Sequence, residues 1–189
     1  MYKLKIITST VREGRKGPAV ARWIEDIARQ HGSFEVDLLD LAEINLPMMN
    51  EPHHPMLKKY TFDYTKKWSA MVEQADAFIF VTAEYDYNYP APLRNAIEYL
   101  SQEWEYKAAG IISYGGVSAG TRAANSLKGD LATMKMVPIP EMVNFPFFSH
   151  NINEENVFVA NDISHTAAKT MLDAIVRWTK GLIIIRENL

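Results

Sequence analysis

The feature that most constrains the fold of this chain is a repeated switch between strand-like and helix-like spacing of its apolar residues. Strand-like segments occur at residues 2–8, 34–41, 77–83, 108–114 and 137–143, and a helical pattern follows each of them. Strict alternation of this kind predicts parallel strands joined by right-handed helical crossovers. We therefore expect an α/β protein with helices on both faces of a doubly wound, five-stranded parallel sheet of strand order 2-1-3-4-5.

This strand order is the flavodoxin-like arrangement, and the length of 189 residues without internal repeats predicts a single domain over residues 1–189. Residues 77–83 (AFIFVTA) form a continuous apolar run, as expected for a central strand that is buried on both faces. Residues 34–41 alternate apolar and acidic side chains, which indicates a strand nearer an edge. Two prolines in 137–143 place that strand at an edge or leave it irregular. The proline-rich residues 42–60 are predicted to form a long excursion.

Composition excludes several classes of function. The chain has no cysteine, which rules out disulfides, thiolate metal sites and a cysteine nucleophile. The net charge of −3 gives no electrostatic footprint for nucleic acid or for a membrane surface. The first residues lack the apolar region of a signal peptide, and no apolar stretch is long enough to span a bilayer, so we expect a cytoplasmic protein. His53 and His54 lack a third ligand at a telling spacing, so no metal site is expected.

On a sheet of this type, ligands bind at the carboxyl ends of the strands, here in the loops after the first, third and fourth strands. The first loop combines a hydroxyl, three positive charges and a glycine-proline helix start, which favours binding of an anion such as a phosphate. It is neither a Walker A loop nor a G-x-G-x-x-G loop, which disfavours a nucleoside triphosphate or a dinucleotide. The alternative is a solvated basic turn. The candidate phosphate-binding residues are Thr10, Arg12, Arg15, Lys16, Gly17 and Pro18.

The other two loops have the composition of a site for a planar ring. The third loop contains three tyrosines, which offer aromatic faces, and the fourth contains three glycines, which let the backbone approach a flat ligand. The alternatives are tyrosines that buttress a surface loop and a tight turn without function. Together with a phosphate site, two such walls describe a site for flavin mononucleotide (FMN). These two loops are residues 83–90 and 113–120.

Three segments, in the right order, resemble the NAD(P)H-dependent FMN reductases, the flavodoxin-like family that includes azo- and quinone-reducing enzymes. They are TSTVREGRKGPAVARWI (8–24), TAEYDYNYPAPLRNAIEYL (82–100) and EWEYKAAGIISYGGVSAGTRA (103–123). The resemblance implies an FMN-containing oxidoreductase with NADPH or NADH as co-substrate. It also implies that the flavin ring contacts Glu84, Tyr85, Asp86, Tyr87, Asn88, Tyr114, Gly115, Gly116 and Ser118. A hydride would pass from the nicotinamide to N5 of FMN and then, in ping-pong fashion, to a quinone, an azo compound, free flavin or a similar small acceptor. It also implies a homodimer or homotetramer. No side chain need act as a catalytic acid or nucleophile, because the flavin carries the chemistry.

The chain departs from the family's usual pattern at three positions: Ser9 stands where glycine is common, Ala83 where proline is common and Asp86 where asparagine is common. A carboxylate at position 86, near the flavin pyrimidine, would disfavour the anionic reduced flavin, unless the contacts there come from backbone N–H groups.

Two other functions fit the same fold. A flavodoxin-type electron carrier would dock a protein partner, but such carriers are strongly acidic and have a phosphate loop rich in Thr and Ser. A phosphate-binding regulator would need an acidic cluster beside the first strand, which residues 8–13 do not supply. The sequence therefore favours the reductase over both alternatives.

Overall fold

A computed structural model of the protein describes residues 1–188 and confirms the expected sheet. All neighbouring strands pair in parallel, and their spatial order is β2-β1-β3-β4-β5. The strands are β1 (Tyr2–Thr8), β2 (Phe34–Asp40), β3 (Ala77–Ala83), β4 (Ala108–Tyr114) and β5 (Val137–Phe145).

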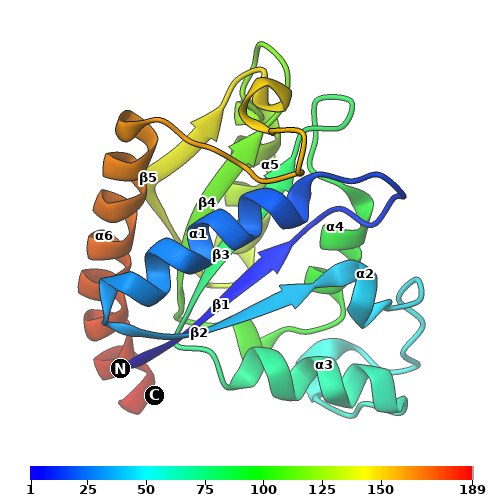
Figure 1. Ribbon diagram of the computed structural model, residues 1–189. Coiled ribbons are helices and arrows are strands. Elements are labelled where there is room, and N and C mark those ends of the chain that lie inside the picture. Colours follow the sequence, from blue (N-terminus) through cyan, green and yellow to red (C-terminus); the bar gives the residue numbers. More distant parts are fainter. Residues whose placement is uncertain (189) are drawn as a thin grey trace.

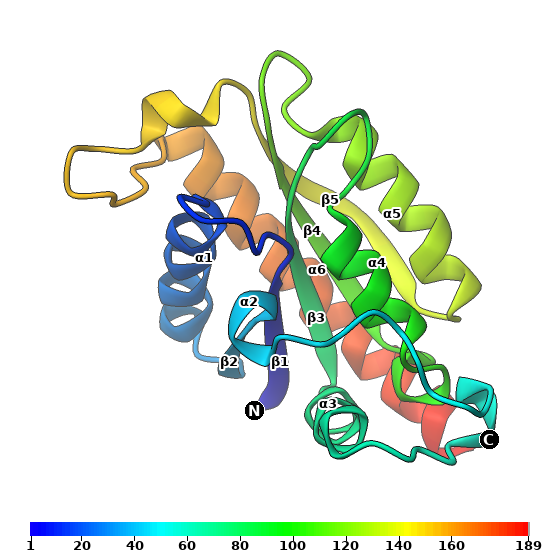
Figure 2. The same cartoon turned by 90° about the vertical axis from the view of Figure 1, so that its right-hand side faces the viewer.

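Helices cover both faces of this sheet (Figures 1 and 2). Helices α1 (Gly17–His31) and α6 (Asp162–Glu187) lie on one face. Helices α3 (Asp63–Glu73), α4 (Ala91–Glu98) and α5 (Thr121–Thr133) lie on the other. The doubly wound architecture predicted from the alternating pattern is therefore confirmed.

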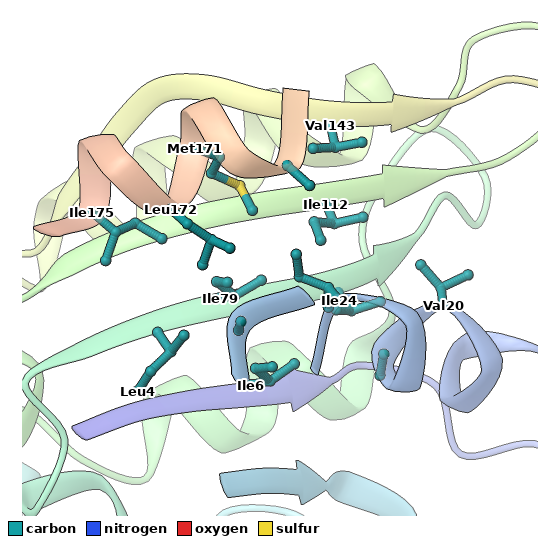
Figure 3. Close-up of a cluster of buried hydrophobic side chains, with 14 of the residues drawn as sticks. Leu4, Ile6, Val20, Ile24, Ile79, Ile112, Val143, Met171, Leu172 and Ile175 are labelled. Carbon is teal, nitrogen blue, oxygen red and sulfur yellow. The ribbon is translucent and has the colours of Figure 1, made fainter. Parts of the chain in front are cut away.

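The core under α1 and α6 is built from the side chains that the sequence periodicity places inward. Apolar side chains from all five strands meet the apolar stripes of the two helices, and the residues of this core are nearly free of solvent contact (Figure 3). The residues labelled in that view are Leu4, Ile6, Val20, Ile24, Ile79, Ile112, Val143, Met171, Leu172 and Ile175.

Strand β5 shows how a proline-containing segment joins the sheet. Pro138 and Pro140 cannot donate a ladder hydrogen bond, and β5 lies at the edge of the sheet, where one side needs no partner. Its register with β4 shifts between Ala109 and Ile111, and the strand then continues to Phe145, beyond the expected end at residue 143. Both parts of the prediction, an edge position and an irregularity, are observed.

The excursion between β2 and α3 is ordered by contacts with α4. It contains the short helix α2 (Leu41–Ile44) and a 3-10 turn at residues 55–57. The Asn95 amide donates to the carbonyl of Pro47 at 2.7 Å and accepts from the N–H of Met49 at 2.8 Å. His54 caps the 3-10 turn, because its Nδ1 accepts from the N–H of Met56 at 3.2 Å.

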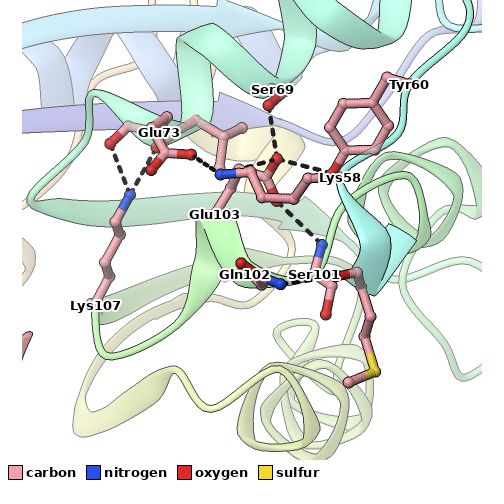
Figure 4. Close-up of polar contacts among 10 residues, drawn as sticks. Lys58, Tyr60, Ser69, Glu73, Ser101, Gln102, Glu103 and Lys107 are labelled. Carbon is pink, nitrogen blue, oxygen red and sulfur yellow. Dashed lines mark hydrogen bonds and ion pairs between the residues drawn. The ribbon is translucent and has the colours of Figure 1, made fainter. Parts of the chain in front are cut away.

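A buried polar network holds α3 at the amino-terminal edge of the sheet (Figure 4). The Glu103 carboxylate is 1% exposed and accepts from the Tyr60 hydroxyl at 2.8 Å and from the Ser69 hydroxyl at 2.6 Å. The Lys107 ammonium donates to the carbonyls of Val72 and of the next residue, at 2.9 and 3.0 Å, where α3 ends. Burial lowers the pKa of Lys107 to about 8. These groups stabilise the end of the sheet that lies opposite the candidate ligand site.

The apolar segment near the carboxyl terminus continues helix α6 as far as Glu187. Leu182 is buried against the core, whereas Ile184 and Ile185 are exposed, as is Trp178 nearly two helical turns earlier. Within residues 1–188, no helix has both the length and the apolarity needed to cross a membrane.

Candidate functional site

Three loops meet at the carboxyl-terminal edge of the sheet, as predicted: the β1 loop (residues 9–16), the β3 loop (84–90) and the β4 loop (115–120). They lie together because β1, β3 and β4 are neighbours in a parallel sheet. Backbone hydrogen bonds continue this pairing past the strand ends. The N–H of Ser9 donates to Val81 O at 3.1 Å, and the N–H of Glu84 donates to Tyr114 O at 3.1 Å.

The start of α1 forms a cradle of three residues, Thr10, Gly17 and Tyr114, which we call the hydroxyl cradle. A Cβ atom at Gly17 would lie 2.5 Å from Thr10 Oγ1 and 2.8 Å from the Tyr114 hydroxyl, so both hydroxyls face this glycine closely. Both are buried, and neither finds a hydrogen-bond partner among residues 1–188; the same holds for the buried Ser9 hydroxyl. Buried polar groups without partners are costly, so this arrangement calls for an external acceptor.

Two basic side chains of the β1 loop flank this cradle. Arg12 Nε donates to the Tyr85 hydroxyl at 3.1 Å, and Lys16 is hydrogen-bonded to Asn156. Both basic residues line a cavity of about 80 Å³, which is small beside the roughly 300–1,000 Å³ of a whole small-molecule site. Such a cavity suits one group of a ligand. Its lining residues are Arg12, Lys16, Ala83, Glu84, Tyr85, Tyr114, Gly115 and Phe148.

The third basic residue of this loop, Arg15, points to β2. Arg15 Nη1 donates to Asp40 Oδ1 at 2.8 Å and to the carbonyl of Thr10 at 3.2 Å. Asp40 Oδ1 also accepts from the Thr8 hydroxyl at 3.1 Å and from the N–H of Ala42 at 3.0 Å, at the start of α2. Arg15 therefore braces the β1 loop against β2, and the structure does not bring it into the cavity lining with Arg12 and Lys16.

The β3 loop is built on a tight turn that explains the residue at position 86. The N–H of Tyr85 donates to Asn88 O at 2.8 Å and the N–H of Asn88 to Tyr85 O at 2.9 Å. Between them, Asp86 and Tyr87 have φ values of 48° and 70°. Asp and Asn tolerate this left-handed conformation better than most residues, so the backbone accepts an aspartate at position 86.

Glu84 links the β3 loop to the β4 loop. Its carboxylate accepts from the Ser118 hydroxyl and from Arg122 Nη1, both at 2.8 Å. Burial acts to raise the pKa of Glu84, but the hydrogen bonds from Ser118 and Arg122 outweigh it and lower the pKa, so the carboxylate is charged at neutral pH. The Arg122 guanidinium also lies 4.0 Å from the centre of the Tyr87 ring. The side chains of Glu84 and Ser118 thus hold the two loops together.

One segment next to the cradle lacks a strand-like or helical spacing of apolar residues and could not be predicted as part of the site: residues 146–161, between β5 and α6. The Phe148 ring packs on the Tyr114 ring with centroids 4.7 Å apart, and Asn156 contacts Lys16. The segment lies beside the amino-terminal end of α1 (Figures 1 and 2). The aromatic run FPFF at residues 145–148 is the feature that could have drawn attention to it.

A larger hollow of about 330 Å³ lies beside Val11, between α2 and α4. Its lining is mostly apolar and contains no charged side chain; its polar side chains are Asn45 and Asn95. The amide of Asn95 is already engaged by Pro47 and Met49. This hollow therefore lacks the cationic partners that an anionic ligand needs, in contrast to the cavity at the cradle.

Residues 2–150 match the family described as NADPH-dependent FMN reductase. The chain belongs to this family. An NAD(P)H-dependent FMN reductase of Schizosaccharomyces pombe is 36% identical over 142 residues, which cover 74% of this chain and 70% of that protein. A second NAD(P)H-dependent FMN reductase, from a Nectria species, is 35% identical over 154 residues, covering 78% of this chain and 76% of that one. The resemblance noted in the three loop segments is thereby confirmed.

Solved structures show the same fold. The flavoenzyme FerB of Paracoccus denitrificans, an NAD(P)H:acceptor oxidoreductase, superposes with a TM-score of 0.77 at 20% identity, over 96% of this chain and 98% of that one. A flavodoxin of Streptococcus pneumonia superposes with a TM-score of 0.58 at 12% identity, over 93% and 98% of the two chains. The likeness to both reductase and flavodoxin structures confirms the flavodoxin-like architecture of this family member.

The hydroxyl cradle agrees with the cofactor for which the family is named. FMN ends in a single phosphate, and the start of α1 offers unpartnered hydroxyls, a glycine without Cβ and two cations, Arg12 and Lys16. Helix amino termini favour anions, because their backbone N–H groups and the helix dipole point outward. The residues present at this position therefore fit a phosphate.

Proposed function

We propose that this reductase holds FMN across the carboxyl ends of β1, β3 and β4 and uses NADPH or NADH to reduce a small acceptor. Quinones, azo compounds and free flavins are the acceptor classes. The observation that carries the proposal is the hydroxyl cradle, where buried hydroxyls without partners surround a helix start beside two cations. The names of relatives support it: besides the FMN reductases, a quinone reductase of Pseudomonas putida is 23% identical over 95% of this chain and 96% of that one.

In this proposal the phosphate lies at the start of α1. The Thr10 hydroxyl and the charges of Arg12 and Lys16 bind it, and Gly17, which has no Cβ, leaves room for the hydroxyls of Thr10 and Tyr114. Pro18 costs nothing there, because an N–H in the first helical turn has no intrahelical partner. Arg15 keeps the loop in place through Asp40, which presents the other basic residues to the cavity.

The flavin ring lies against the β3 and β4 loops. Tyr85, Asp86, Tyr87 and Asn88 line one side with backbone and aromatic surface, and the β4 loop lines the other with Gly115 and Gly116. Glu84 and Ser118 fix the distance between the two walls through their hydrogen bond. Bound there, FMN supplies hydride transfer from the nicotinamide to the acceptor, and the protein needs no acid or nucleophile of its own.

The test is the visible spectrum and the turnover of the purified protein. We expect a bound-flavin absorption band, retention of FMN over FAD, and steady NAD(P)H oxidation with a quinone in the absence of any other protein. FAD should bind poorly, because its adenylate extends from the phosphate that the small cavity encloses. A flavin-loaded protein that oxidises NAD(P)H only after a partner reductase is added would be a flavodoxin-type carrier instead.

Substitution of Arg12 by alanine should weaken FMN binding about ten- to a hundredfold. A charge-assisted contact to phosphate contributes on the order of 1.5–3 kcal/mol, and Arg12 lies at the phosphate end of the cofactor. Turnover of the variant at saturating FMN should stay near that of the parent. Higher salt should reduce the difference in FMN affinity between the variant and the parent, because it screens the charge of Arg12. Quenching of flavin fluorescence measures the affinity. Arg22→Ala, which removes an exposed charge from α1, is the control and should leave the affinity unchanged.

We also propose that the enzyme is a cytoplasmic homodimer or homotetramer. The exposed apolar side chains of Trp178, Ile184 and Ile185 on α6 are the surface that a second copy would cover, and a monomer would leave them in water. Sedimentation at micromolar concentration tests the assembly, and a stable monomer would contradict it. Recovery of the protein in the cytoplasmic fraction of its cells tests the location.

A further inference from the structure

We propose that the Tyr114 hydroxyl binds the FMN phosphate and positions the cofactor from that end, whereas the sequence places Tyr114 among the contacts of the flavin ring. The inference rests on the proposed function, since FMN is its ligand. It adds a residue of β4 to a phosphate site otherwise formed by the β1 loop and the start of α1. The phosphate would then contact β4, the strand that leads into the loop beside the flavin ring.

The direction of the Tyr114 side chain follows from the alternation along β4. The neighbouring Ser113 hydroxyl donates to the carbonyl of Ala119 at 2.8 Å and so serves the β4 loop. Tyr114 faces the opposite side of the sheet, where it belongs to the core cluster under α1. Its ring packs on Phe148 and is 2% exposed. The side chain therefore extends beneath the loops towards α1, where it lines the small cavity together with Arg12, Lys16 and Tyr85.

The hydroxyl ends at the start of α1. A Cβ atom on Gly17 would lie 2.8 Å from it, and among the described residues it has no hydrogen-bond partner. Burial raises the pKa of Tyr114, while the adjacent Thr10 hydroxyl and the charges of Arg15 and Arg12 act in the opposite direction, and the phenol keeps its proton at neutral pH. This phenol is protonated and buried, it lies beside cations and a helix amino terminus, and its O–H has no acceptor among the described residues. It is therefore able to donate to an anionic ligand.

Comparison of FMN with riboflavin separates the two possible roles, because riboflavin has the same ring and ribityl chain but lacks the phosphate. Tyr114→Phe removes only the hydroxyl. We expect the variant to bind FMN about tenfold more weakly, because it loses a hydrogen bond to the charged phosphate. It should bind riboflavin as the parent does, because riboflavin has no phosphate for the hydroxyl to contact. Affinities are measured by flavin fluorescence quenching on protein freed of flavin.

Tyr64→Phe is the matched control. Tyr64 lies on α3, away from the three loops, and its hydroxyl donates to Asn50 Oδ1 at 2.8 Å. This substitution should change neither affinity. Equal loss of both flavins in Tyr114→Phe, or no loss of either, would overturn the inference. A Tyr114→Phe chain that fails to fold in a urea unfolding experiment would overturn it as well, since an unpartnered hydroxyl contributes nothing to the fold. If the parent protein binds no FMN at all, the proposed function itself fails.

Discussion

Substitution of Gly120 by alanine is expected to destabilise the fold by about 2–4 kcal/mol. Gly120 has a φ of 76°, a left-handed conformation that costs other residues roughly 1–2 kcal/mol. A Cβ there would also lie 2.7 Å from the backbone nitrogen of Tyr114 and 2.9 Å from its carbonyl oxygen, and backbone atoms of a central strand cannot move aside cheaply. Urea unfolding followed by circular dichroism measures the change.

Gly116→Ala is the control for this prediction. Gly116 lies in the same β4 loop, and a Cβ added to it meets no atom within 4 Å. The control should unfold within about 0.5 kcal/mol of the parent, as surface substitutions usually do. Equal stability of the Gly120 and Gly116 variants would show that the close approach of Gly120 to β4 is not needed for folding.

Gly17→Ala should weaken FMN binding by about a hundredfold while leaving the protein folded. The added Cβ would lie 2.5 Å from Thr10 Oγ1 and 2.8 Å from the Tyr114 hydroxyl, so it occupies the hydroxyl cradle and forces both groups to shift. Two hydrogen bonds to a phosphate are then disturbed, which costs on the order of 3 kcal/mol. The folded backbone accepts alanine, because only the ends of two side chains must move. Flavin fluorescence quenching and urea unfolding together check both halves of the expectation.

Gly129→Ala controls for the effect of alanine on helix stability. Gly129 lies within α5, where a Cβ meets no atom within 4 Å. Alanine there should stabilise the helix by about 0.5–1 kcal/mol and leave FMN affinity unchanged. If Gly17→Ala also bound FMN like the parent, the phosphate would not lie in the cradle.

Much of the fold was predictable because its determinants are local. The run AFIFVTA and the alternating segment at 34–41 predict a central strand and an edge strand, and β3 and β2 occupy those places. Pro18 and Gly32 predict the bounds of the first helix, and α1 runs from Gly17 to His31. The three loops meet as expected because topology alone brings the ends of β1, β3 and β4 together.

Side-chain partners across long sequence separations were not predictable. Arg15 has the charge expected of a phosphate ligand, and its guanidinium pairs with Asp40 at the end of β2. Lys16 meets Asn156, which is 140 residues away and lies in a segment without periodic pattern. Glu84, which stays a predicted ring contact, also joins two loops through Ser118, 34 residues away. Each outcome depends on which of several polar neighbours is nearest once the chain has folded, and composition cannot rank them.

The buried polar network at Glu103 and Lys107 has a consequence for how such a reductase evolves. The network lies at the amino-terminal edge of the sheet, and the loops that face the ligand lie at the opposite edge. Substitutions at distant sites without shared partners are usually additive in free energy. A lineage can therefore accumulate changes in the β3 and β4 loops, and so explore new acceptors, while stability gained around Glu103 offsets what those changes cost. Stability at one edge of the sheet and acceptor choice at the other can therefore change independently of each other.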